Sequence, residues 1–191
     1  MAVEISRRHF TVEEYDKMGE AGILAEDDRV ELIDGEIIEM SPIGSHHAAC
    51  VTRLNMLLTR LADHNLIVTV QNPIRLNDDS EPQPDLALLK FRTDFYSDQL
   101  PTPSDILLVV EVADSSIEYD RMFKVPRYAR DGIPEVWLVD LSRDTIEGYS
   151  RPLTAGYQVT WQKKRGDALI VPGLSGASVL VTDILGATVA G

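Results

Sequence analysis

Hydrophobic residues recur along this chain with two different spacings, which predict helices in some segments and strands in others. Spacing of three and four positions predicts the longest helix, from Ser45 to about His64. Its apolar positions are Val51, Leu54, Leu57, Leu58 and Leu61. We expect this helix to pack on a sheet.

A shorter helix is predicted near the start of the chain. Thr11 precedes Glu13 and Glu14, an arrangement typical of a capped helix N-terminus. We expect this helix to end near Gly19 or Gly22. A third helix is predicted over residues 116–130, where Pro126 must mark either its beginning or a kink.

Short apolar runs bounded by turn residues predict the strands. Two alternating runs within 29–40 flank Asp34-Gly35, which is typical of a tight hairpin turn. Residues 178–185 are expected to contain a short helix. The other predicted strands lie at residues 66–70, 73–76, 85–89, 106–112, 133–140, 145–149, 157–161 and 168–171. Strands and helices interleave without a strict alternating period, which predicts an α/β fold with a mixed sheet.

The length and the charge limit the possible functions. At 191 residues and 44% hydrophobic content, the chain can bury one sizeable core, and we expect a single domain over residues 1–191. The net charge of −13 repels polyanions on average, which counts against nucleic acid as a partner. Bound metal or a local basic strip would weaken that objection.

The single cysteine and the amino terminus indicate a compartment. Cys50 cannot form an internal disulfide, and its place in an apolar helical pattern is typical of a packed thiol in a reducing environment. Residues 1–8 have no apolar core of signal-peptide length, and no run approaches a membrane span. We therefore expect a cytoplasmic protein with no membrane partner.

Two carboxylates stand at the ends of apolar runs. Asp85 follows Pro84 at the head of one run, and Glu111 ends a second one. If the two segments pair as neighbouring strands, both carboxylates meet at one edge of a buried sheet. Mg²⁺ and similar hard cations need only a few protein oxygens and keep several waters. The pair therefore predicts a divalent-metal site, which can activate water against a phosphodiester.

The basic group that often accompanies such carboxylates is displaced. A two-carboxylate nuclease usually carries a lysine two positions after the glutamate, where this chain has Ala113. Lys90 is a poor substitute, because it lies five positions after Asp85 and an odd offset places it on the opposite face of the strand. In the following helix, Lys124 stands between Asp120 and Tyr128 at intervals of four. We expect its ammonium to hold the attacking water or to neutralise charge on a phosphoryl oxygen.

Simpler readings stand beside these assignments. Asp85 alone could be a turn residue after proline, and Lys124 a solvated helix residue. Glu31, a possible third ligand, could instead pair across its hairpin with a basic residue. His46 and His47 cannot chelate one ion together, because adjacent helical residues point about 100° apart. Packing or capping is the expected role of His47.

Other polar and aromatic residues have structural explanations. Asp114, Ser115 and Ser116 are expected to cap the next helix, with Asp114 as a candidate support for a metal ligand. The basic run 163–165 is expected to be a solvated turn. Trp161 and Tyr157 fit either an outer hairpin or a dimer surface.

An ordered series of motifs over roughly residues 10–185 resembles the Uma-two family of the PD-(D/E)XK, restriction-endonuclease-like superfamily. The motifs are Arg29-Val-Glu-Leu-Ile-Asp-Gly-Glu, Met40-Ser-Pro with His47, Gln83-Pro-Asp-Leu, Val110-Glu-Val-Ala-Asp-Ser-Ser, Asp120 with Lys124 and Tyr128, and Gly132-Ile-Pro-Glu-Val-Trp-Leu-Val-Asp. The resemblance implies a restriction-endonuclease-like α/β core, with a mixed central β-sheet flanked by helices and extra β-hairpins.

The same resemblance implies roles for individual residues. Asp85 and Glu111 would be metal ligands, the Val112 carbonyl a further one, and Lys124 the migrated lysine. Glu31 matches the family's upstream acidic position. Ala113 departs from the Glu-X-Lys pattern of the superfamily, as it does in Uma-two proteins, and fold alone does not settle catalytic activity.

The leading hypothesis is therefore a Mg²⁺- or Mn²⁺-dependent endonuclease that hydrolyses DNA phosphodiester bonds. The alternative is a catalytically inactive protein that keeps the nuclease fold as an interaction or regulatory subunit, which the charge and Ala113 favour. A third reading is a hydrolase of small phosphoesters. Because double-strand cutting needs two active sites, a homodimer is expected for the first hypothesis.

Overall fold

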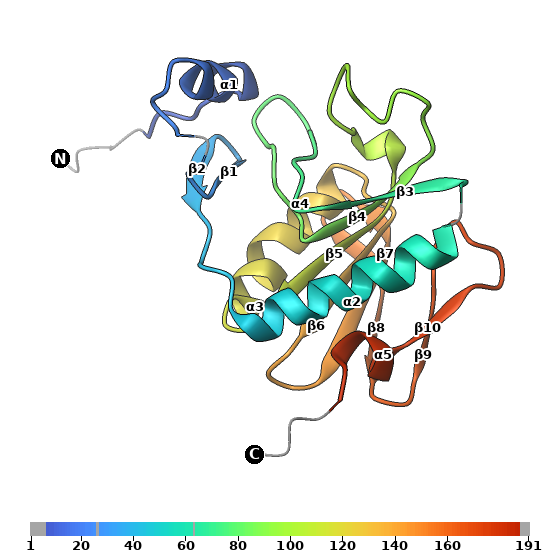
Figure 1. Ribbon diagram of the computed structural model, residues 1–191. Coiled ribbons are helices and arrows are strands. Elements are labelled where there is room, and N and C mark those ends of the chain that lie inside the picture. Colours follow the sequence, from blue (N-terminus) through green and yellow to red (C-terminus); the bar gives the residue numbers. More distant parts are fainter. Residues whose placement is uncertain (1–6, 26, 63, 188–191) are drawn as a thin grey trace.

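Six strands form the central sheet of the computed structural model, which describes residues 7–25, 27–62 and 64–187. Their order is β3, β4, β5, β6, β7, β8 (Figure 1). The strands are β3 (Leu66–Val70), β4 (Leu86–Lys90), β5 (Ile106–Ala113), β6 (Glu135–Asp140), β7 (Thr145–Leu153) and β8 (Gly156–Lys164). Strands β5 and β6 are parallel and the other neighbours are antiparallel, so the prediction of a mixed sheet is confirmed.

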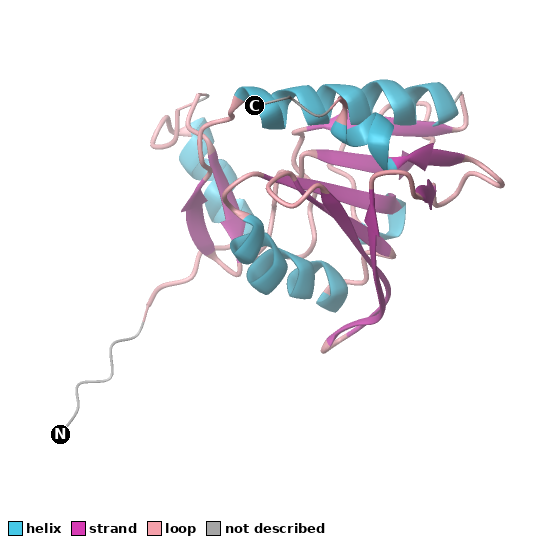
Figure 2. Ribbon diagram, turned by 90° about the horizontal axis from the view of Figure 1, so that it is seen from below, coloured by secondary structure: helices cyan, strands magenta, loops and turns pink. Residues whose placement is uncertain are grey.

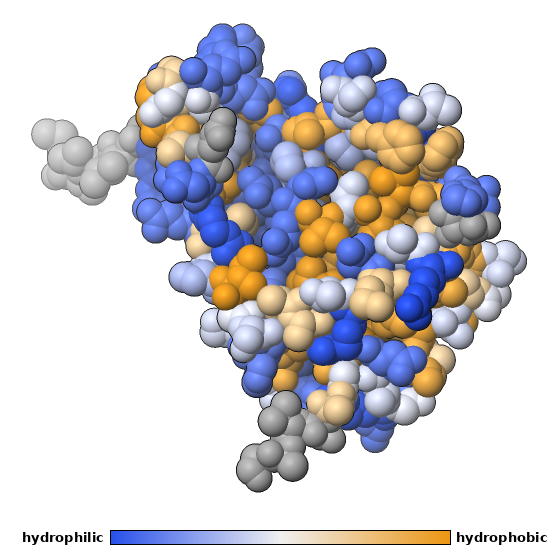
Figure 3. Space-filling model, in the orientation of Figure 1, coloured by the Kyte–Doolittle hydropathy of each residue, from blue (hydrophilic) through white to orange (hydrophobic). Residues whose placement is uncertain are grey.

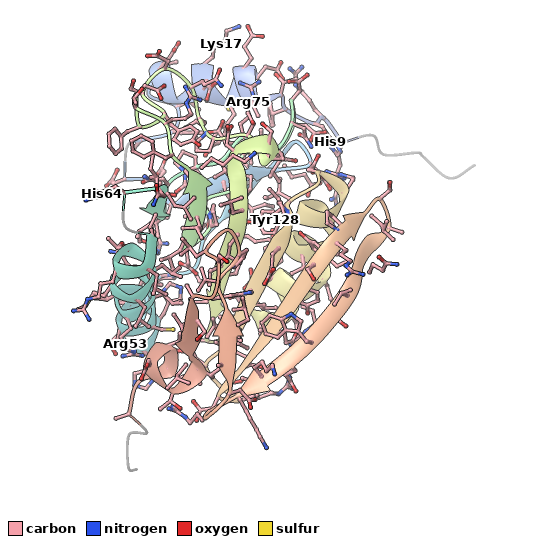
Figure 4. The ribbon with its side chains drawn as sticks, turned by 90° about the vertical axis from the view of Figure 1, so that its right-hand side faces the viewer. His9, Lys17, Arg53, His64, Arg75 and Tyr128 are labelled. Atoms are coloured by element: carbon pink, nitrogen blue, oxygen red, sulfur yellow. The ribbon has the colours of Figure 1, made fainter. Side chains whose placement is uncertain are left out.

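Helices cover both faces of this sheet, as the view in Figure 2 shows. On one face lies α2 (Ser45–Ala62), which buries Cys50, Leu54 and Leu58 against apolar residues of β4, β5 and β6. Arg53 of α2 donates hydrogen bonds of 2.8 Å to two carbonyls of α5 (Val181–Leu185), and it lies at the periphery of the molecule (Figure 4). None of the helices in the described ranges is both long and apolar enough to cross a membrane.

A continuous helical segment covers the other face and makes the crossover between the parallel strands β5 and β6. It consists of α3 (Ile117–Tyr119), the π-helical turn η2 (Asp120–Lys124) and α4 (Val125–Arg130). The N–H of Val125 donates to the Asp120 carbonyl five residues earlier. The expected irregularity at Pro126 therefore takes the form of a π turn just before it, since proline has no N–H to continue the regular ladder.

Alternation along β5 assigns its residues to these two faces. Leu108, Val110 and Val112 belong to the core under α2, whereas Val109 and Ala113 belong to the core under α4. Period-two alternation places Glu111 on the α4 face with them. A carboxylate in the middle of a buried face needs partners from the helix that covers it.

The amino-terminal elements form a separate layer beside the sheet (Figure 1). They are α1 (Val12–Glu20), β1 (Val30–Ile33) and β2 (Glu36–Glu39). The predicted cap of α1 is confirmed, because Thr11 and Glu14 exchange the two hydrogen bonds of a capping box. The hairpin turn is also confirmed, since Asp34 and Gly35 both have positive φ, as a type I′ turn requires. Residues 1–6, on which part of the signal-peptide expectation rests, lie outside the described residues.

Two predicted elements differ from the structure. Residues 73–76 do not form a strand; Ile74 and Leu76 are buried in a loop whose N–H groups bond to Pro82 and Ser80 carbonyls. Prolines 82 and 84 lack the N–H groups that a regular ladder would need. Residues 178–185 begin as β10 (Ser178–Leu180), paired with β9 (Ala168–Ile170), and become helical only in α5. The remaining short element is η1 (Pro103–Asp105).

The aromatic residues of the outer strands pack within the molecule. Trp137 is fully buried, and Trp161 meets it edge to face at 6.5 Å between ring centroids. The Tyr157 hydroxyl donates to the Ile133 carbonyl at 2.8 Å. At the opposite edge, β3 is only half buried, and apolar side chains gather over it beside α2 (Figure 3).

Glu81 anchors the amino-terminal layer to the loop before β4, and its carboxyl group is buried. Its N–H donates to the Leu32 carbonyl at 2.8 Å. Burial, with Asp16 nearby, raises the pKa of the Glu81 carboxyl to about 7 from an ordinary 4.5. Between these two pH values the unfolded chain loses a proton that the folded chain keeps, so the free energy of unfolding falls as pH rises.

We therefore expect Glu81→Gln to raise the free energy of unfolding by up to about 3 kcal/mol at pH 8 and by less than about 1 kcal/mol at pH 5. Urea denaturation at both pH values measures this difference. Glu20→Gln, which changes an exposed carboxylate on α1, is the matched control. An equal effect of Glu81→Gln at both pH values would contradict the explanation.

Candidate functional site

The site is built where β4 begins and β5 ends. The two strands pair antiparallel with Leu86 opposite Val110, and extending this register by one residue brings Asp85 opposite Glu111. Asp85 Oδ2 accepts the Val112 N–H at 2.9 Å, which ties the start of β4 to the end of β5. The prediction that these two segments are neighbouring strands is confirmed.

Asp85 is also held from two other elements. Gln71, after β3, donates to Asp85 Oδ1 at 3.2 Å. His47, in the first turn of α2, places Nε2 3.0 Å from Asp85 Oδ2. The hydrogen bond to Asp85 raises the pKa of His47, although burial opposes it. His47 Nδ1 is buried without a hydrogen-bond partner among the described residues.

His47 thus contacts a predicted site residue directly, which was not expected from the sequence. Packing or capping is its expected role from the sequence, whereas the structure places it against Asp85. The available signal was its place in the motif series near Met40. His46, by contrast, is exposed.

Glu111 lies under the crossover helix with 3% of its surface exposed. The Tyr128 hydroxyl donates to Glu111 Oε1 at 2.6 Å, and Lys124 Nζ donates to the same oxygen at 3.3 Å. Figure 4 shows Tyr128 in the interior of the molecule. Burial raises the pKa of Glu111 to about 8, although Lys124 lowers it. One ammonium therefore does not fully compensate the loss of water around this carboxylate.

Lys124 joins the hairpin to this cluster. Its Nζ lies 3.0 Å from Glu31 Oε1, and the Gln83 N–H donates to Glu31 Oε2 at 3.2 Å. Burial alone would lower the pKa of Lys124. The nearby Glu111 and Glu31 carboxylates raise this pKa by more than burial lowers it, so the net shift is upward. The lysine is therefore a buried cation between two carboxylates. The alternative prediction, that Lys124 is a solvated helix residue, is wrong.

The helical stripe predicted at intervals of four faces the sheet as expected. Asp120, Lys124 and Tyr128 are all buried. Burial raises the pKa of Asp120, whose Oδ2 accepts a hydrogen bond from the Ser116 hydroxyl at 2.9 Å. Ser116 is the N-cap residue of α3 but makes no side-chain cap bond, so the capping role predicted for its side chain is wrong. The Ser116 hydroxyl donates to Asp120 instead of capping the helix.

Lys90 lies away from the site, as predicted. Lys90 is exposed and donates to the Ser104 carbonyl at 2.6 Å. Ala113 is buried in the apolar core under α4. The solvated turn predicted for the basic run 163–165 is only partly confirmed: Lys163 and Lys164 end β8, and Arg165 alone lies in the turn, where it donates to both Asp144 carboxylate oxygens, at 3.0 and 2.9 Å.

Asp85, Glu111, Glu31 and Lys124 line a cavity of about 500 Å³. Its acidic lining exceeds its basic lining: Glu31, Glu39, Asp85, Glu111, Asp114 and Asp120 against Arg29, Lys124 and His47. Such an excess attracts cations. Val112 also lines the cavity.

The donor set fits a hard cation that uses few protein ligands. Asp85 and Glu111 supply carboxylate oxygens from adjacent strands, which is enough for an ion that keeps several waters. In the described part of the chain, no three His, Cys, Asp or Glu side chains are already placed around one ion position. Both oxygens of Glu31 are engaged, by Lys124 and Gln83, so a ligand role for Glu31 stays a prediction.

Replacing the buried ammonium tests the electrostatic description. We expect Lys124→Met to lower the free energy of unfolding by about 3 to 5 kcal/mol, because Glu111 and Glu31 would remain buried without their counter-charge. Urea denaturation measures the change. The double variant Lys124→Met, Glu111→Gln should recover part of the loss, whereas Lys90→Met, at an exposed lysine, should change stability by less than about 0.5 kcal/mol. A loss no larger than that of the control would refute the buried-pair account.

Comparisons with known proteins agree with this architecture. The Uma2 family model, described as "Putative restriction endonuclease", matches residues 12–183. A crystal structure of a "putative nuclease" from Anabaena variabilis has a TM-score of 0.71 at 16% identity, covering 92% of this chain and 97% of that one. The type IIG restriction endonuclease BpuSI has a TM-score of 0.41 at 17% identity, covering 76% of this chain and 16% of that one. No curated protein matches the chain.

The Anabaena variabilis structure has the same fold over nearly its whole length, and the predicted restriction-endonuclease-like α/β architecture is confirmed. The resemblance to the Uma-two family read from the motifs is confirmed as well. Because the family model covers residues 12–183 of 191, the chain belongs to the Uma2 family.

Proposed function

We propose that this protein is a Mg²⁺- or Mn²⁺-dependent endonuclease that hydrolyses DNA phosphodiester bonds. The observation that carries the proposal is the meeting of Asp85 and Glu111, from adjacent strands, with the buried Lys124 ammonium 3.3 Å from Glu111. The description of the Uma2 family supports the same chemistry. The Anabaena variabilis structure supports the fold on which this chemistry would take place.

Asp85, Glu111 and the Val112 carbonyl would hold the cation, with Glu31 as an assisting carboxylate. The bound cation supplies charge stabilisation for the phosphoryl oxygens and makes water a better nucleophile. The excess of acidic over basic side chains in the cavity lining supports cation binding. Because burial raises the pKa of Glu111 to about 8, a bound cation would have to displace the proton that Glu111 holds below that pH.

The residues around the ligands would position the reacting groups. Lys124 would hold the attacking water or neutralise charge on the phosphoryl group, because its Nζ is a charged donor within the cavity lining. Tyr128 fixes Glu111 by donating to Oε1. His47 and Gln71 fix the two oxygens of Asp85. Ligands held from several elements keep their orientation when the cation binds.

The inactive interaction protein remains the competing function. The net charge of −13 and the engagement of Glu31 by Lys124 favour it. Metal binding without cleavage of any DNA would support this function. Turnover of a small model diester without affinity for DNA would instead support the small-phosphoester hydrolase. The homodimer and the cytoplasmic location stay predictions, and sedimentation velocity tests the dimer.

Removing either carboxylate should abolish the activity. We expect Asp85→Asn and Glu111→Gln each to slow Mg²⁺-dependent cleavage of plasmid and single-stranded DNA by more than about 100-fold, because each removes a ligand charge. Isothermal titration with Mn²⁺ should show weaker binding in the same variants. Asp98→Asn, at an exposed loop carboxylate, is the control and should match the wild type. Unchanged Mn²⁺ affinity in both site variants would exclude these residues as ligands.

The contact between His47 and Asp85 should matter less than the ligands themselves. We expect His47→Ala to weaken Mn²⁺ binding and slow cleavage by about 10- to 100-fold, because Asp85 loses one of its orienting partners. His46→Ala, which changes the exposed neighbour, should leave both quantities unchanged. Equal effects of the two substitutions would show that only the helix end is being perturbed.

A further inference from the structure

Most basic residues at or near the cavity are committed to ion pairs; Arg29, which lines the cavity, instead donates to the Ser41 carbonyl at 2.9 Å. Lys124 binds Glu31 and Glu111. On the same helical segment, Arg121 pairs with Glu147 at 2.8 Å.

The other two arginines of that segment are engaged at the hairpin turn. Arg127 and Arg130 pair with Asp34 at 2.5 and 2.7 Å. Duplex DNA is bound mainly through many phosphate contacts from lysine and arginine. Around this cavity the structure provides few side chains for such contacts, so affinity must have another source.

An aromatic pair, of which Tyr119 lines the cavity, offers another source of affinity. Tyr119 lines the cavity, and its ring stacks on Phe123 with centroids 5.2 Å apart and planes at 23°. Phe123 is 45% exposed, and the Arg127 guanidinium carbon lies 5.7 Å from its ring centroid. Stacked rings next to a cation are the usual elements of a surface that binds unpaired bases.

Tyr119 also lies close to the proposed chemistry. Burial, followed by the nearby Glu31 carboxylate, raises the pKa of its hydroxyl, while Lys124 opposes the shift. The ring therefore stands in the electrostatic field of the cluster. Tyr119, Glu111 and Asp85 all line the same cavity.

The burial of the site residues also favours a ligand with unpaired bases. Glu31, Glu111 and Lys124 have 2%, 3% and 6% of their surface exposed. A phosphate reaches such groups only if its strand enters the cavity, which a stacked and paired duplex opposes. A volume of about 500 Å³ lies within the range of pockets that enclose small ligands, and a single nucleotide is a ligand of that size.

We propose that the cavity accepts single-stranded DNA, with one unpaired base stacked beside Tyr119 and the adjoining phosphate directed toward Asp85 and Glu111. This rests on the proposed nuclease function and names its substrate class. Base stacking is tolerant of sequence, because every base has a flat aromatic face. Recognition at this position therefore depends on strand state and not on base identity.

Fluorescence anisotropy with a labelled single-stranded oligonucleotide and its duplex tests the proposal, with Ca²⁺ in place of Mg²⁺ so that binding is read apart from cleavage. The wild type should bind the single strand at least tenfold more tightly than the duplex. Tyr119→Ala should weaken single-strand binding about tenfold, and Tyr119→Phe, which keeps the ring, should not. Phe95→Ala, at a ring 68% exposed in another loop, is the matched control. Circular dichroism confirms that each variant is folded.

Cleavage in Mg²⁺ is measured separately, so the two proposals can fail independently. Binding that depends on Tyr119 without any cleavage by the wild type would uphold the stacking site and overturn the nuclease. Cleavage with duplex binding as tight as single-strand binding, or with Tyr119→Ala equal to the wild type, would overturn the stacking site alone. Failure to bind either strand would overturn it as well.

Discussion

One buried ammonium group links the parts of this site. Lys124 Nζ lies 3.0 Å from Glu31 and 3.3 Å from Glu111, so it joins the amino-terminal hairpin to the middle of the central sheet. Removing two carboxylates and an amine from water costs several kcal/mol for each ion, and mutual attraction offsets this cost only when the groups remain in contact. If the hairpin, β5 or the π turn shifted separately, a buried charge would lose its partner, which would cost several kcal/mol.

That single cation leaves part of the negative charge uncompensated. Burial raises the pKa of Glu111 to about 8 and also raises that of Asp120, although Lys124 lowers both. Asp85 adds a third carboxylate, held by the Val112 N–H, Gln71 and His47. The divalent cation proposed above would supply positive charge beside these carboxylates.

The spacing of residues along the sequence predicted those parts of the site that depend on which face of a strand or helix a residue occupies. Alternation in β5 places Glu111 on the face that meets the crossover helix, and spacing of four places Lys124 and Tyr128 on one stripe. Periodicity could not predict the contact of His47 with Asp85, because the contact depends on how α2 lies across the sheet. The irregular loop at 73–76 was missed because the pairing that shapes it involves prolines, which change backbone hydrogen bonding without changing hydropathy.

The crossover helix explains why an acidic protein has so few free cations near its cavity. Lys124 of this helical segment forms an ion pair with Glu31 of the hairpin. Arg127 and Arg130 form ion pairs with Asp34, three residues farther along the same hairpin. The hairpin is thus held at both its strand and its turn by one helical segment. Because these cations fix the geometry of the carboxylates, they cannot also bind a run of phosphates without releasing the hairpin. Any polyanionic ligand of this site must therefore be recognised by forces other than a broad basic surface.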